Sequence, residues 1–135
     1  MILFVYGEDT YRSKYYLHTL KVKYQKDIDP SNLNNEELDA SSVSIPDMVT
    51  AIQSTPFMVK RRLVVVTGIC QSKNATEDLK LLQSTCEQID GRKNESDAIV
   101  VFYESTSGLG RTKFAKYLKN LSHAKSFDLL EGFAL

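Results

Sequence analysis

The sequence predicts an α/β domain in which helices cover both faces of a parallel β-sheet. Three uninterrupted apolar runs occur at Met1–Tyr6, Leu63–Val66 and Ala98–Tyr103, and such runs are typical of strands that are buried on both faces of a sheet. Segments with the apolar spacing of amphipathic helices alternate with these runs. This alternation indicates parallel strands joined by right-handed crossovers. Because the chain has 135 residues, we expect a single domain.

The first strand is expected to end at Gly7, and a helix should follow it. Asp9 or Thr10 can cap this helix, which would run to about Lys26. Its apolar stripe consists of Tyr16, Leu17, Leu20 and Tyr24. The turn formers that follow, at residues 27–35, predict a polar loop.

The middle of the chain should contain a short strand, a helix and a buried strand. We expect the short strand at residues 36–40. The run Ser44-Ile45-Pro46-Asp47 resembles a capping box with proline in the first turn of a helix. That helix should stop before Pro56, and the buried strand at Leu63–Val66 follows.

The last third should contain two helices and a final short strand. The first helix is indicated by Leu79, Leu82, Cys86 and Ile89. We expect the residues from Ile89 to Arg92 and the polar residues after them to close this helix and form a loop. A further helix is predicted at Arg111–Leu121, with lysines on a solvated face, and the last strand at Phe127–Leu130.

Composition limits the classes of function. Seventeen Lys and Arg residues balance seventeen Asp and Glu residues, whereas a protein that grips duplex DNA by itself usually carries a basic excess. We therefore expect contact with DNA to be indirect. Cys70 and Cys86 belong to no ligand cluster, which predicts reduced thiols and no metal site. The absence of a signal peptide and of a membrane-spanning apolar run predicts a cytoplasmic protein.

The turn after the first strand is the position at which a P-loop fold binds phosphate. The functional pattern G-x-x-x-x-G-K-[ST] supplies bare backbone around the phosphates, a lysine for the terminal ones and a hydroxyl for magnesium. With Gly7 as the first glycine, Arg12 replaces the second glycine, Ser13 the lysine and Lys14 the hydroxyl residue. We therefore expect a degenerate phosphate loop that binds neither nucleotide nor another cofactor.

The acidic residues of an ATPase are missing as well. Thr67 and Gly68 follow the strand at Leu63–Val66, where an ATPase would carry Asp-Glu. Glu104 follows the next strand and could be a replacement carboxylate, although a strand-end glutamate is more often only solvated. These observations favour a non-catalytic module that binds a specific partner. One alternative is a small divergent P-loop NTPase or nucleotide kinase that uses Lys14 and Glu104. Another is a generic protein-interaction domain.

The segment Gln53-Ser54-Thr55-Pro56-Phe57-Met58 is the one connection in which large apolar residues gather. It follows a helix and precedes a buried strand. From the residues alone, two interpretations are open. Phe57 either folds back over the sheet edge as part of the core, which is the commoner fate of such a residue, or is an exposed anchor for the apolar pocket of a partner.

Several of these segments resemble a known family. The opening strand with Y-G-E-D-x-Y, the D-A-S segment at 39–41 and A-I-Q-S-T-P-F-M-V-K-R-R-L-V-V-V at 51–66 are similar to the N-terminal domain of the delta subunit of the bacterial DNA polymerase III clamp loader. The resemblance covers essentially all 135 residues, in order and with similar spacing. The combination of G-E-D-x-Y with S-x-P-F-x-x-x-R-R-L-V-V-V carries most of its specificity.

The resemblance implies an AAA+-like, three-layer domain with a five-stranded parallel sheet. Met1–Tyr6 would lie between the last strand and Ala98–Tyr103, with Leu63–Val66 next and the short second strand at the edge. The resemblance also implies a non-catalytic module that binds the ring-shaped sliding clamp, the beta subunit, and helps to open it during DNA replication. The helical lid and collar domains of the family, which join the other loader subunits, would fall outside residues 1–135.

The family also implies where the clamp binds. Its clamp-binding element follows the helix that ends near Gln53, and its two apolar plug residues match Pro56 and Phe57. The family often has leucine at the first plug position, so Pro56 is a departure that bears on affinity more than on location. The resemblance thus favours the exposed interpretation of Phe57. The expected clamp-binding residues are Gln53, Thr55, Pro56, Phe57 and Met58.

Overall fold

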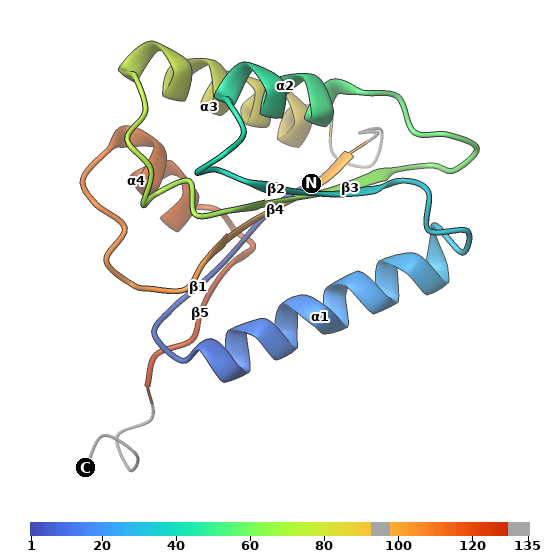
Figure 1. Cartoon of the computed structure of the whole chain (residues 1–135), viewed down its shortest axis with the longest axis horizontal. Helices are drawn as coiled ribbons and strands as arrows, with labels where there is room; N and C mark the ends of the chain where they lie inside the picture. Colours follow the sequence, from blue (N-terminus) through green and yellow to red (C-terminus); the bar gives the residue numbers. More distant parts are fainter. Residues whose placement is uncertain (93–97, 130–135) are drawn as a thin grey trace.

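Strands and helices alternate in the computed structural model, which describes residues 1–92 and 98–129 (Figure 1). The elements follow one another as β1 (Ile2–Tyr6), α1 (Thr10–Asp27), β2 (Asn35–Asp39), α2 (Ile45–Gln53), β3 (Arg62–Thr67), α3 (Thr76–Arg92), β4 (Ala98–Glu104), α4 (Lys113–Lys119) and β5 (Ala124–Ser126). This order confirms the predicted α/β class.

The five strands form one parallel sheet in the spatial order β2-β3-β4-β1-β5. β1 pairs with β4, with Ile2 opposite Val100 and Tyr6 opposite Glu104, and it pairs with β5 on its other side. The sheet and its order confirm what the resemblance implied. Because parallel strands all end at the same edge of a sheet, the turns after β1, β3 and β4 lie close together.

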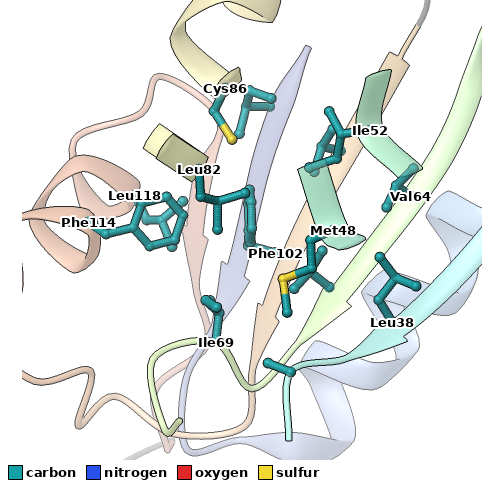
Figure 2. Packing of buried hydrophobic residues seen from close by; sticks show 14 of the residues in the cluster. Leu38, Met48, Ile52, Val64, Ile69, Leu82, Cys86, Phe102, Phe114 and Leu118 are labelled. Atoms are coloured by element: carbon teal, nitrogen blue, oxygen red, sulfur yellow. The ribbon is translucent and has the colours of Figure 1, made fainter. Parts of the chain in front are cut away.

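Helices cover both faces of the sheet and give a three-layer architecture (Figure 1). Helix α1 covers one face, where Leu17 and Tyr24 are buried. Helices α2, α3 and α4 cover the other face and form the larger core. Figure 2 shows part of this core, with Met48 and Ile52 from α2 and Leu82 from α3 pointing towards the sheet.

The two cores explain the uninterrupted apolar run of β3. Val64 and Val66 belong to the core beneath α2, α3 and α4, whereas Leu63 and Val65 belong to the core beneath α1. Successive side chains of a strand point to opposite faces. A strand that is covered on both faces therefore needs an apolar residue at every position, as the sequence predicted.

Polar residues mark the starts of three helices. Asp9 caps α1 by accepting the N–H of the residue three positions on, at 3.1 Å. Ser44 caps α2 in the same way at 3.3 Å, with Pro46 in the first turn, and Thr112 caps α4 at 3.1 Å. Each cap satisfies one of the backbone donors that a helix start leaves unpaired. Of the two caps predicted for α1, Asp9 is the one observed and Thr10 is the first helical residue, and the cap predicted at Ser44 is confirmed.

The last strand differs from its prediction: it is Ala124–Ser126 and not Phe127–Leu130. The N–H of Phe127 still donates to β1 at 2.8 Å, but its carbonyl turns away to accept the N–H of Asp9 at 2.9 Å. The Phe127 side chain is buried in the core beneath α1. Phe127, whose apolar side chain suggested a strand, therefore packs into the core. The strand itself is the short and mostly polar edge segment before it. Leu130 lies outside the described residues.

The bounds of two helices also differ from prediction. Helix α4 is Lys113–Lys119 and not Arg111–Leu121, because Thr112 is its cap and not part of its first turn. Helix α3 starts at Thr76, ahead of its first apolar residue, and continues to Arg92. The residues from Ile89 to Arg92 are thus helical and not loop, and the polar residues 93–97 that we expected to form the loop lie outside the described part of the chain.

Candidate functional site

The connection between α2 and β3, residues 54–61, is the first candidate site and is called the α2–β3 loop below. Helix α2 ends at Gln53, and Ser54 takes an extended backbone with ψ of 141°. The Ser54 hydroxyl donates back to the carbonyl of Thr50 at 2.8 Å. Pro56 cannot continue a helix and disfavours helical backbone in the residue before it. The chain therefore leaves the helix sharply.

The α2–β3 loop presents its apolar side chains to solvent. Phe57 is 62% exposed and Met58 is 87% exposed. Gln53 and Thr55 are also exposed, and Pro56 is half-buried. The core interpretation of Phe57 is therefore wrong, and the exposed interpretation describes its position. The five residues expected from the resemblance lie together as one short surface segment.

The backbone of the α2–β3 loop is held by Asn34, which precedes β2. The Asn34 carboxamide accepts the N–H of Phe57 through Oδ1 and donates to the Phe57 carbonyl through Nδ2 at 2.9 Å. Met58 follows in the left-handed region with φ of 60°, which is uncommon for a residue other than glycine. An exposed aromatic side chain is thus mounted on a backbone that is bonded on both sides of its Cα.

A second layer of polar groups holds Asn34. The Asp29 carboxylate, fully buried, accepts the Asn34 backbone N–H at 2.8 Å and its Nδ2 at 3.1 Å. Burial alone would raise the pKa of Asp29, but the hydrogen bonds from Asn34 and Leu33 outweigh it and leave the pKa below its ordinary value. The Tyr24 hydroxyl lies 2.6 Å from the Arg61 carbonyl oxygen at the far end of the loop.

The sequence did not indicate that Asn34, Asp29 or Tyr24 would hold this loop. The first two lie in a stretch of turn formers that predicted a polar surface loop, and Tyr24 was recognised only as part of an apolar stripe. Asn34 is 1% exposed and Asp29 is 0% exposed. Buried polar residues that satisfy one another are a tertiary feature, and the sequence carries no sign of them.

The turn after β1 is the second candidate site. Gly7 has φ of 137°, and helix α1 already begins at Thr10. The three residues aligned with the second glycine, the lysine and the hydroxyl residue of a phosphate loop therefore lie inside the helix. Arg12 pairs with Asp9 at 3.5 Å, and Lys14 is exposed.

Donors around this turn are bonded within the chain. The N–H of Asp9 donates to the carbonyl of Phe127 at 2.9 Å, and the N–H of Ser13 donates to the carbonyl of Asp9 at 3.0 Å. The Ser13 side chain is fully buried, and its hydroxyl lies 2.7 Å from that of Tyr103 on β4. Ser13, in the place of the phosphate-binding lysine, thus joins α1 to the sheet.

Glu104, the candidate replacement carboxylate, ends β4 at the same edge of the sheet. It is 1% exposed, and its Oε2 accepts the N–H of Cys70 at 3.1 Å. Burial raises the pKa of the Glu104 carboxyl, against the opposing effect of this hydrogen bond. The side chain therefore ties the turn after β3 to the end of β4.

The described residues offer no obvious place for a metal. Over residues 1–92 and 98–129, no group of three or more His, Cys, Asp and Glu side chains is arranged to hold an ion. A groove of about 590 Å³ lies between α3 and α4, lined by residues that include Leu79, Gln83 and Phe114. It is lined by neither the α2–β3 loop nor the turn after β1. Within the same ranges, no helix has the length and apolar character to cross a membrane.

The strand order, the helices on both faces and the turn that follows the interior strand β1 define a three-layer α/β domain with a parallel sheet. Comparison with protein families matches residues 3–128 to the family described as DNA polymerase III, delta subunit. The chain belongs to this family.

A solved structure shares the fold. The Bacillus subtilis DNA clamp loader delta protein (YqeN) superposes with a TM-score of 0.64 at 19% sequence identity. The match covers 96% of this chain and 38% of that one, so the present chain spans well under half the length of the solved protein. A search of curated proteins found no match.

Proposed function

We propose that this domain is the clamp-binding module of a clamp-loader delta subunit, which binds the sliding clamp and helps to open it during DNA replication. One observation carries the proposal: Phe57 and Met58 are exposed at the end of α2 on a backbone that the fold holds in place. Membership of the delta family supports it, as does the fold shared with the Bacillus subtilis DNA clamp loader delta protein.

The two exposed side chains have the chemistry of a binding anchor. Aromatic residues dominate the energy of many interfaces when they enter an apolar pocket. Methionine adapts to irregular apolar surfaces because its side chain is flexible and polarisable. Pro56 and the hydrogen bonds at Phe57 restrict the free loop, which lowers the entropy that binding must remove. The proposed clamp contacts are Gln53, Thr55, Pro56, Phe57 and Met58.

The proposed module does not hydrolyse ATP. A phosphate loop needs free backbone N–H groups aimed at the anion, whereas the N–H groups of Asp9 and Ser13 donate to carbonyls of the chain. Glu8 and Asp9 lie in the turn itself, and their carboxylates would repel a phosphate because like charges repel. Lys14 is exposed, and Glu104 is buried and hydrogen-bonded. These features support a scaffold that keeps the P-loop layout without its chemistry.

The sliding clamp is the direct partner in this proposal. Other loader subunits would join through parts of a delta subunit that lie outside residues 1–135, and DNA would be contacted only indirectly. The balance of seventeen basic and seventeen acidic residues is consistent with a protein that does not hold a duplex by itself.

Binding of the purified chain to the sliding clamp of its own source tests the proposal. Surface plasmon resonance with immobilised clamp should give saturable binding that a large excess of free clamp competes away. Serum albumin, immobilised at the same density, controls for nonspecific adhesion of exposed Phe57 and Met58. Binding that is equal on both surfaces would contradict the proposed function.

A further inference from the structure

The α2–β3 loop has a backbone conformation that an isolated loop would not keep. Met58 adopts φ of 60°, and such a backbone persists in a residue other than glycine only where its surroundings hold it. The side chains of Phe57 and Met58 contribute little to this, because both are mostly exposed. The conformation must therefore be held through the backbone.

Asn34 holds the backbone of the loop through a pair of hydrogen bonds that few other side chains could form. Its carboxamide presents one acceptor and one donor side by side, as the edge of a β-strand does, and they meet the N–H and the carbonyl of Phe57. Aspartate at this position could only accept, and alanine could do neither. Asn34 cannot turn away, because its own Nδ2 and backbone N–H are bonded to buried Asp29.

Tyr24 holds the other end of the loop. Its ring is buried against the sheet beneath α1, and its hydroxyl lies 2.6 Å from the Arg61 carbonyl and 3.2 Å from the Asn34 carbonyl. Burial, followed by the nearby Asp29 charge, raises the pKa of Tyr24 to about 12, so the hydroxyl stays a donor at neutral pH. The backbone of the loop is thus anchored at Phe57 by Asn34 and at Arg61 by Tyr24. Both side chains are buried in the domain and do not reach the surface that Phe57 presents.

We infer that Asn34, supported by Tyr24, is a positioning residue that presets Phe57 and Met58 in their binding conformation. This inference rests on the proposed clamp-binding function and adds a residue that does not touch the clamp. Its consequence is kinetic. When only a fraction of the free molecules has the binding-competent conformation, the apparent affinity falls by that fraction. The fall should appear in the association rate constant, because once the complex has formed the clamp itself holds the loop in place.

The experiment compares Asn34→Ala with two matched variants by surface plasmon resonance on the clamp. Asn34→Ala should lower the association rate constant about ten-fold, with a dissociation rate constant within about two-fold of wild type. Phe57→Leu, which alters a contact, should mainly raise the dissociation rate constant. Asn35→Ala makes the same chemical change at the exposed neighbour, whose amide bonds Asn32 and not the loop, and should change neither rate.

A second readout does not depend on the clamp. Amide hydrogen exchange should show the Phe57 N–H protected in the wild-type chain and exposed in Asn34→Ala, with the strands of the sheet protected in both. Tyr24→Phe removes only the hydroxyl that bonds the Arg61 carbonyl, so it should loosen that end of the loop and lower the association rate constant less than Asn34→Ala does. It serves as the test if Asn34→Ala does not fold.

The outcomes separate the two proposals. If wild-type chain binds the clamp and the folded Asn34→Ala variant associates at the wild-type rate, the positioning role is wrong. It is also wrong if the Phe57 amide exchanges equally in both proteins. If wild-type chain does not bind the clamp at all, the proposed function fails, and the exchange measurement still decides whether Asn34 holds the loop.

Discussion

The backbone of Phe127 crosses so closely over Gly7 that no side chain fits between them. A Cβ built on Gly7 would lie 2.6 Å from the Phe127 carbonyl carbon and 2.7 Å from its nitrogen. Contacts below about 3 Å do not occur between real Cβ atoms and backbone. The sequence pattern placed Gly7 at the first position of a degenerate phosphate loop, whereas the structure gives it a packing role: a residue without a side chain leaves room for the backbone that follows the edge strand β5.

Gly7→Ala is therefore expected to destabilise the domain by at least about 2–4 kcal/mol, from positive-φ strain and a clash with backbone that cannot rotate away. Urea denaturation followed by far-UV circular dichroism measures the change. Gly91→Ala is the matched control: Gly91 lies in α3 with open space around it, so alanine should be neutral or stabilising by up to about 1 kcal/mol. Equal effects of the two variants would contradict the role assigned to the Phe127 crossing.

Mg-ATP is expected not to bind in the micromolar range, and the chain is expected not to hydrolyse it. The N–H groups of Asp9 and Ser13 are already engaged by carbonyls, and Ser13 stands where a phosphate loop carries the lysine for the terminal phosphates. Isothermal titration calorimetry should show no saturable heat. A saturable heat that disappears in Lys14→Ala would mean that the turn after β1 is a working, if unusual, nucleotide site.

Phe57→Ala is expected to weaken clamp binding about thirty-fold or more while leaving the thermal unfolding midpoint almost unchanged. A buried aromatic anchor contributes on the order of 2–4 kcal/mol to an interface, but a side chain that is 62% exposed adds little to the free domain. Affinity by surface plasmon resonance and unfolding by differential scanning calorimetry should be measured on the same preparation.

Two control variants make this result specific to Phe57. Phe102→Ala removes the same side chain from the centre of the core, where Phe102 is fully buried, and should cost about 3–5 kcal/mol of stability. Tyr11→Ala removes an aromatic side chain that is 83% exposed on α1 and should leave the affinity unchanged. A large fall in the Phe57→Ala unfolding midpoint, with wild-type affinity per folded molecule, would mean that Phe57 is structural.

Glu104 should make stability depend on pH. Because burial raises the pKa of its carboxyl in the folded state, the folded chain binds this proton more tightly than the unfolded chain. The resulting stabilisation is complete below the ordinary glutamate pKa and is lost as pH rises through the raised folded value. Glu104→Gln removes the ionisation and should flatten this part of the profile, with stability at neutral pH at least equal to that of wild type.

Urea unfolding at a series of pH values that rise from the ordinary glutamate pKa follows this loss. Glu77→Gln is the control, because the Glu77 side chain is 86% exposed in the first turn of α3 and should leave the shape of the profile as in wild type. If Glu104→Gln keeps the wild-type slope, the carboxyl does not ionise across this range as its environment implies.

Much of the fold could be predicted from the sequence because its signals are local. The runs Met1–Tyr6, Leu63–Val66 and Ala98–Tyr103, which lie in β1, β3 and β4, are apolar at every position, and that pattern alone indicates strands covered on both faces. Ser44 and Pro46 mark the start of α2, and Pro56 marks where it cannot continue. The gathering of apolar residues around Phe57 singled out the α2–β3 loop, although only the family resemblance favoured its exposure and implied the order of the strands.

What the sequence determined by itself was therefore the series of elements, the apolar loop and the departures from a phosphate-loop motif. The tertiary structure alone decided how distant polar groups meet. Asn34 reaches Phe57 across 23 positions, and Ser13 reaches Tyr103 across 90. An asparagine in a run of turn formers has the same local sequence pattern whether its side chain faces water or hydrogen-bonds the backbone of a distant segment. Which of the two occurs depends on the strand order and the crossover geometry, because these determine which segments lie within hydrogen-bonding distance once the sheet is assembled.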